Sequence, residues 1–208
     1  MPTTTNNGWP TPADTDLVKN GADAIRDLGN AIDTTLGVYS PVTSGLVKIN
    51  TTSFSAVSSI SAPTNTFTST YDHYKIVWNV TASAASTTEM QFRLRAGGTD
   101  DTATNYHFST YGLRVNGATG QFSGTGVNKW SFTYGATGAR MSASIDVYAP
   151  KLAQLTKYTC LSFGDDGTAA IQYHSGGYFN ATTSFDSFSI IPMASNMTGE
   201  MSVYGYNK

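Results

Sequence analysis

The stretch YKIVWNVT, residues 74–81, decides the fold class of this chain, because its large apolar side chains recur at every second position. One face of the stretch carries Tyr74, Ile76, Trp78 and Val80, and mainly polar residues separate them. A period of two is that of a β-strand with one buried face. The stretch therefore predicts a half-buried strand of an antiparallel sheet.

Similar short runs follow on both sides, each bounded by Gly, Asn or Thr-rich turns. The residues expected in strands are 46–49, 54–57, 74–81, 90–94, 106–108, 113–115, 127–134, 141–148, 158–163, 169–173, 185–191 and 201–206. No helical segment long enough to connect parallel strands lies between them, so we predict a mainly β fold, an antiparallel β-sandwich of jelly-roll type over residues 46–208. Its predicted core is Ile76, Trp78, Val80, Phe92, Leu94, Phe132, Ile145, Val147, Leu161, Phe163, Ile171, Phe188, Ile190 and Val203.

The composition agrees with such a fold and excludes several classes of partner. The 208 residues include 31 threonines and 22 serines, only 12% are charged, and the net charge is −2. With so little positive charge the chain offers no basic surface for nucleic acid. Cys160 is the one cysteine, which rules out an intrachain disulfide and favours a small buried residue. The first twelve residues lack the basic and apolar runs of a signal peptide, and no membrane-spanning run is expected.

A different period appears in TPADTDLVKNGADAIRDLGNAIDTTLG, residues 11–37. Its apolar and small residues recur every three or four positions, which predicts one amphipathic α-helix before the sandwich. Thr11 is the expected N-cap, with Pro12 at the first helical position, Asp14 completing a capping box, and Gly37 as the stop. Residues 1–10 are then an extended arm and residues 38–45 a linker. Trp9 in the arm either packs near the start of the helix or inserts into a neighbouring protein.

The apolar face of this helix requires a partner, because an isolated helix of this length is marginal in water. The partner is the β-domain, a second copy of the chain or another protein. Positions 18, 25 and 32 repeat every seven residues, a seam compatible with two or three helices, and we expect a homo-oligomer, with a trimer favoured. The anchoring and oligomerisation residues are Leu17, Val18, Gly21, Ile25, Leu28, Ile32 and Leu36.

Two parts of the chain resemble proteins of tailed bacteriophage particles. The segment TPADTDLVKNGADAIRDLGNAID is similar to the opening of virion and tail-appendage proteins, and the match covers residues 10–33. The β-part resembles the sandwich that follows it in such proteins, through residues 71–76, 94–100 and 199–205. The resemblance implies a structural protein of the virus particle, made in the host cytoplasm, whose partners are other virion proteins. A tail or fibre appendage and a capsid decoration or head-fibre protein are both compatible with it.

The residue types that carry chemistry do not form a catalytic pattern, so we predict no enzymatic activity and no cofactor. His73, His107 and His174 are scattered, and none has a neighbouring ligand at metal-binding spacing. The loops at residues 98–102 and 164–168 each contain two aspartates. Such loops suit either calcium or tight hairpins, and we favour the hairpin and predict no metal site.

Tyrosines in the β-part are the candidate ligand-binding residues. Flat aromatic faces beside hydroxyl and amide groups are suited to sugar rings, so we consider Tyr106, Tyr111, Tyr173 and Tyr178 as a site for host-surface glycans. The alternative for each of them is a place in the core or in a subunit interface. Weak sites of this kind gain apparent affinity when several copies act together.

Overall fold

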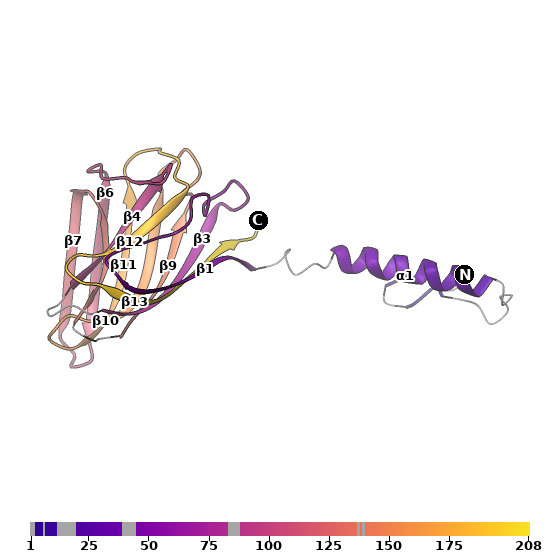
Figure 1. Ribbon diagram of the computed structural model, residues 1–208, viewed down its shortest axis with the longest axis horizontal. Coiled ribbons are helices and arrows are strands. Elements are labelled where there is room, and N and C mark those ends of the chain that lie inside the picture. The colour runs from indigo at the N-terminus through magenta and orange to yellow at the C-terminus, as the bar shows by residue number, and fades with distance from the viewer. Residues whose placement is uncertain are drawn as a thin grey trace. The chain divides into compact units, whose positions relative to one another are not determined.

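The computed structural model describes residues 3–5, 7–11, 20–38, 45–82, 88–136, 138 and 140–208, with the side chains of the helix described as far as Thr35. The chain divides into two compact units, Met1–Gly45 and Leu46–Lys208. The first contains the helix α1 (Gly21–Val38), and the second consists of antiparallel strands (Figure 1). The first strand begins at Leu46, where the sequence placed the start of the sandwich.

The second unit is a β-sandwich of two antiparallel sheets. The larger has eight strands in the order β1-β13-β3-β9-β10-β11-β6-β7, and the smaller has the order β2-β12-β4-β5, with β8 also paired to β4. The strands are β1 (Leu46–Val57), β2 (Ile60–Ser61), β3 (His73–Ala82), β4 (Thr88–Ala96), β5 (Thr99–Asp100), β6 (Tyr106–Arg114), β7 (Thr119–Val127), β8 (Trp130–Gly135), β9 (Arg140–Tyr148), β10 (Lys157–Asp165), β11 (Ala170–Phe179), β12 (Ser187–Pro192) and β13 (Met197–Tyr206).

The strand order is that of a jelly roll with two insertions. The sets β1-β13-β3-β9 and β2-β12-β4-β8 reproduce the two four-stranded sheets of that fold. Strands β5 to β7 are inserted between β4 and β8, and the hairpin β10-β11 is inserted between β9 and β12. The inserted strands β10, β11, β6 and β7 extend the larger sheet beyond β9 and so enlarge its surface (Figure 1).

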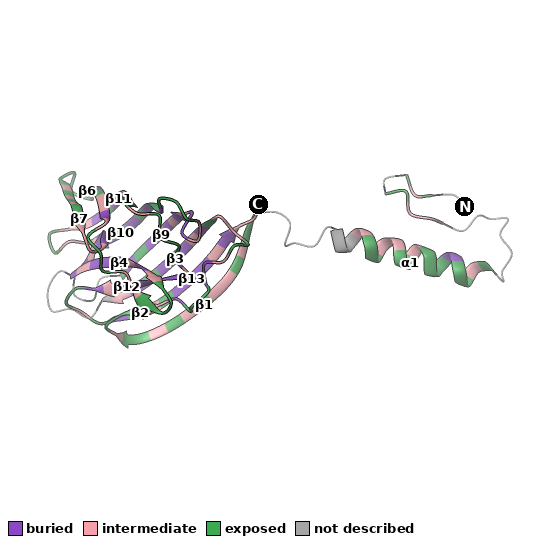
Figure 2. Ribbon diagram, turned by 90° about the horizontal axis from the view of Figure 1, so that it is seen from above, coloured by how far each residue is buried: buried purple, intermediate pink, exposed green. Residues whose placement is uncertain are grey.

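The core lies between the two sheets (Figure 2). Buried residues alternate with more exposed ones along β3, β9, β10 and most of β11, whereas β8 and β12 are buried almost throughout. Twelve of the predicted core residues are buried, but the prediction is wrong for Leu161 and Phe163, which are 47% and 43% exposed. The inward positions of β10 are instead Tyr158, Cys160 and Ser162. The Ser162 hydroxyl donates to the carbonyl of Phe132 at 2.9 Å, so this serine satisfies a buried acceptor of β8.

Some predicted strand boundaries also differ. Residues 46–57 form one strand with register shifts rather than two strands, and residues 106–114 form one continuous strand. The strand β7 was not predicted, because its sequence TGQFSGTGV lacks apolar alternation. Its glycines have a packing reason: a Cβ on Gly124 would lie 2.5 Å from the Phe108 ring, and one on Gly120 would lie 2.9 Å from Ile171.

The first unit departs from the predicted extended arm. Thr3 pairs with Pro10, and the amide of Thr4 donates to the carbonyl of Trp9 at 2.8 Å, so the arm folds into a tight turn. The Trp9 indole donates to Thr35 Oγ1 at 3.0 Å, near the end of the helix rather than its start. The helix continues through Gly37 to Val38, so Gly37 is not its stop. The capping roles of Pro12 and Asp14, and the anchor positions Leu17 and Val18, lie outside the described residues.

Candidate functional site

The face of the larger sheet that points away from the smaller sheet, called here the outer face, is the candidate functional surface. Side chains alternate between the two faces of a strand, so the neighbours of each core residue point to the outer face. In β10, for example, exposed and buried residues alternate from Lys157 to Gly164. Several large apolar or aromatic side chains are exposed on this face. They are Val77, Tyr111, Leu113, Leu161, Phe163 and Tyr178.

All three histidines of the chain lie on the outer face, and each is opposite a tyrosine of the neighbouring strand. His107 stacks on Tyr178 with ring centroids 4.7 Å apart and planes 3° from parallel. His73 meets Tyr148 edge-on at 5.4 Å. His174 is the register partner of Tyr111. The histidines that looked scattered in the sequence therefore belong to three cross-strand aromatic pairs.

Two of the four candidate glycan tyrosines are accessible on this face. Tyr111 is 52% exposed and Tyr178 is 39% exposed. The expectation is wrong for Tyr106, which is fully buried: its hydroxyl accepts from the Leu94 amide at 3.1 Å and donates to the Asp101 carbonyl at 3.0 Å. Burial raises the pKa of Tyr106 well above its usual value.

Tyr173 is also buried and cannot present a ring face to a sugar. Its ring packs edge-on against Phe122 at 5.4 Å, and a Cβ on Gly112 would lie 2.5 Å from it. Desolvation raises its pKa. Together with Tyr134 it lines a small hollow on the inner side of the inserted strands, beside the ion pair of Arg114 and Asp166.

The aspartate-rich loops are closed by intramolecular contacts. Asp166 accepts from Arg114 Nη2 at 2.6 Å and from the amide of Thr168 at 3.1 Å. Its partial burial by itself raises the pKa, but these hydrogen bonds outweigh burial and hold it below the usual value. The predicted hairpin at residues 164–167 is present, with Asp165 paired to Ala170. Within the described ranges no three potential metal-binding side chains gather.

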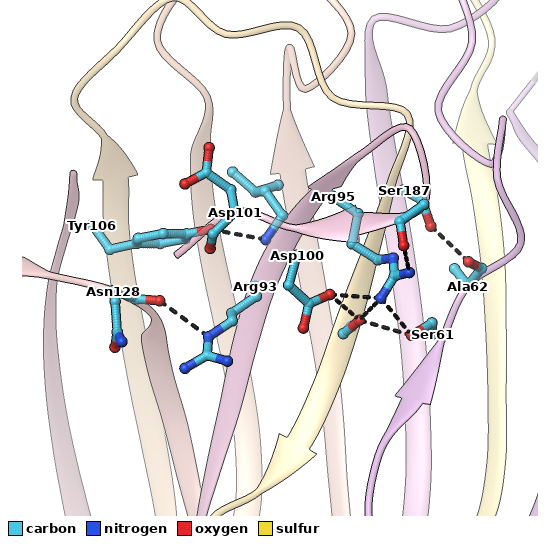
Figure 3. Close-up of polar contacts among 12 residues, drawn as sticks. Ser61, Ala62, Arg93, Arg95, Asp100, Asp101, Tyr106, Asn128 and Ser187 are labelled. Carbon is cyan, nitrogen blue, oxygen red and sulfur yellow. Dashed lines mark hydrogen bonds and ion pairs between the residues drawn. The ribbon is translucent and has the colours of Figure 1, made fainter. Parts of the chain in front are cut away.

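The other loop is fixed by a polar network on the smaller sheet (Figure 3). Arg95 Nη1 donates to Asp100 Oδ1 at 2.6 Å, to Ser61 Oγ at 2.9 Å and to Ser189 Oγ at 2.8 Å. Ser189 in turn donates to Asp100 Oδ1 at 2.7 Å. The network joins β2, β12, β4 and β5 and explains why Asp100 stays close to the sheet.

The helix in the first unit carries a second candidate surface. On this helix Ala24 is 5% exposed, and the predicted anchor residues Gly21, Leu28 and Ile32 are half-buried. Ile25, at the centre of the predicted anchor face, is 67% exposed. The side chain of Leu36 lies outside the described residues.

Sequence reasoning missed the His–Tyr pairs because strand register determines them, and register joins residues far apart in the chain. The available signal was the occurrence of each histidine in or beside a strand that contains a tyrosine.

Comparisons with known proteins do not assign the chain to a family. No family model matches the chain, and no curated protein matches it. One solved structure that aligns with it is a candidate pore-forming toxin from Bacteroides vulgatus, with 7% identity and a TM-score of 0.08. The alignment covers 74% of this chain, which spans about 60% of the length of that one. So low a score supports no inference about fold or function. Within the described residues, no helix has both the length and the apolarity needed to span a membrane.

Proposed function

We propose that this chain is a structural protein of a bacteriophage particle, an oligomeric tail or fibre appendage. In this proposal the helical unit attaches the protein to its assembly, and the β-sandwich is displayed and contacts host-surface glycans. The resemblance of residues 10–33 to phage appendage proteins supports the proposal, and so does the division of the chain into a helical unit and a self-contained sandwich.

The observation that carries the proposal is the exposure of Ile25 in the middle of the anchor face. A helix that packed only on its own unit would turn its largest central apolar residue inward, as it does with Ala24. Burying an isoleucine stabilises an assembly by roughly 1.5–3 kcal/mol per copy. Contact with a second or third copy, or with another virion protein, removes this residue from water.

The substitution Ile25→Asp tests the attachment, because a carboxylate at a buried contact has no partner and loses its hydration. Asn30→Asp, at an exposed position of the same helix, is the matched control, since it adds the same charge outside the anchor face. We expect the wild-type protein and the control to sediment as one oligomer at micromolar concentration and Ile25→Asp to sediment as monomer. A wild-type protein that is monomeric both free and with purified particles contradicts the proposal.

Antibody labelling distinguishes a location on the tail from a location on the capsid. Antibody raised against residues 46–208 and detected by gold in electron micrographs should mark the tail or its fibres. Label distributed over the shell would instead assign the protein to capsid decoration, and the absence of label from particles would remove the virion role altogether.

A further inference from the structure

We propose that a groove across the outer face is a binding site for a linear oligosaccharide. The groove crosses the strands β9, β10, β11, β6 and β7 approximately at right angles. Its floor is the register row Asp146, Thr159, Gly176, Ser109 and Ser123. This inference rests on the proposed contact with glycans, but it does not depend on where in a particle the protein lies.

Aromatic residues form the two walls. One wall is the adjacent row, in which Tyr148, Tyr178 and His107 stand beside Lys157 and Thr125. The other wall is the row on the opposite side of the floor, with Leu161, His174 and Tyr111 between Ser144 and Gln121. Large side chains therefore flank a line of small hydroxyl and glycine residues over several neighbouring strands.

The surface is hollowed along this line. A hollow of about 420 Å³ is lined by His107, Ser109, Gly176 and Tyr178. A second, of about 460 Å³, is lined by residues that include Asp146, Thr159, Leu161 and His174. Both volumes fall in the range of roughly 300–1,000 Å³ that ligand sites occupy. A third hollow, at Ser109, Tyr111 and Ser123, shares Ser109 with the first. The second hollow follows along the same floor row, because its Thr159 is the register partner of Gly176 in the first.

Gly176 is the residue that keeps the groove open. A Cβ there would make only an ordinary contact, 3.6 Å from the carbonyl oxygen of Tyr158, and the glycine does not have a positive φ. Neither backbone conformation nor packing therefore requires glycine at this position. Its neighbour Gly177 differs, because a Cβ there would lie 2.2 Å from the carbonyl oxygen of His107.

The chemistry of the groove fits a chain of sugars better than other occupants. Tyr178 and His107 present flat rings that stack with the apolar face of a sugar, and Ser109, Ser123 and Thr159 supply hydroxyl groups that both donate and accept. Asp146 is held by Lys75 at 3.3 Å and by the Tyr206 hydroxyl at 2.5 Å, which leaves its other oxygen lone pairs for sugar hydroxyls.

The length of the groove and the few charges near it narrow the class of ligand further. Four steps between adjacent strands at about 4.8 Å each give a groove of about 19 Å, long enough for several sugar units in a row. A nucleic acid requires a series of cations along its backbone. The cationic side chains of the described groove and its immediate border are Lys157 and Lys75, and Lys75 is already paired with Asp146. The charges of a polyphosphate backbone would therefore not be neutralised there.

Two pairs of variants of the full-length oligomer test the site. Gly176→Val fills the groove, and Ala170→Val places the same side chain on the same strand and face but outside the groove. Tyr178→Ala removes part of a wall, and Leu113→Ala truncates an exposed residue of the same face that does not line it. The probe is an array of linear oligosaccharides of two to six sugars, uncharged and acidic, read beside sedimentation of each variant.

We expect the wild-type protein to bind linear members of the array, Gly176→Val and Tyr178→Ala to bind at least about tenfold more weakly, and both control variants to bind as the wild type does. Tyr178→Trp, which keeps an aromatic face, should retain binding. If the wild-type oligomer binds no glycan, both this inference and the glycan role in the proposed function fail. If it binds but the groove variants bind equally well, only the groove is wrong. A groove variant that loses its oligomeric mass would show that the groove is a contact between copies, which also overturns the assignment.

Discussion

Replacing Phe188 with alanine should lower the free energy of unfolding by about 4 kcal/mol, whereas the same change at Phe163 should lower it by less than about 1 kcal/mol. Phe188 is fully buried, stacks on Phe92 at 4.9 Å and lies 5.6 Å from Phe67. Truncation of a buried phenylalanine costs about 3–5 kcal/mol, because burial is lost and a cavity remains. Phe163 is 43% exposed, so its removal gives up only part of this burial and opens no enclosed cavity.

Urea denaturation of the full chain, followed by far-ultraviolet circular dichroism, measures both values. The slope against urea should stay constant, since neither change alters the area exposed on unfolding by much. In thermal melts the Phe188 variant should lose about 8–16 °C at roughly 2–4 °C per kcal/mol. Equal losses for the two variants would refute the reasoning, because they would mean that Phe163 faces the core and that β10 is shifted by one residue.

Three further outcomes follow from the same structure. Asp166→Asn should destabilise the sandwich by about 1–3 kcal/mol at pH 7, since a carboxylate whose folded pKa is depressed stabilises above its unfolded pKa of about 3.9 and loses this effect as the pH falls through the folded value. The melting temperatures of variant and wild type should therefore converge as the pH falls from 7 to about 2. A difference that stays constant between these pH values would be inconsistent with a stabilising ion pair between Asp166 and Arg114. Burial raises the pKa of the Cys160 thiol, so a disulfide reagent at pH 8 should modify it only after denaturation, and rapid labelling of the folded protein would contradict its buried position. Residues 46–208 made alone should melt cooperatively, as a unit with its own core does, and an insoluble or non-cooperative fragment would show that the two units depend on each other.

Local pattern was sufficient for the fold class but not for the orientation of every strand. Alternation around Trp78 predicted a half-buried strand because large apolar residues mark one face clearly. In β10 both faces carry apolar side chains, and the choice between Leu161 and Cys160 is made by neighbours on β8 that sequence periodicity does not reveal. Strand β7 escaped prediction because its glycines reflect contacts with bulky side chains elsewhere in the chain.

The candidate tyrosines show the same difficulty in predicting which face of a strand a side chain occupies. Tyr106 and Tyr111 lie five positions apart in one strand, and because five is odd they point to opposite faces; Tyr173 and Tyr178 are related in the same way. Treating residues 106–108 and 113–115 as separate strands concealed this relationship. The outer groove could not be predicted at all, because its floor takes one residue from each of five strands and exists only when their registers are fixed.

The position of β13 determines when this sandwich can form during synthesis. The strand pairs with β1 on one side and β3 on the other, and Thr51 hydrogen-bonds to Ser202, 151 residues later in the chain. Until β13 leaves the ribosome, β1 and β3 have no common neighbour and present open edges. Contacts between residues so distant in sequence make folding slow, and unpaired edges of nascent chains can join one another. The larger sheet therefore cannot be completed until β13 has been made, and a lower expression level, which keeps unfinished chains apart, should increase the soluble yield.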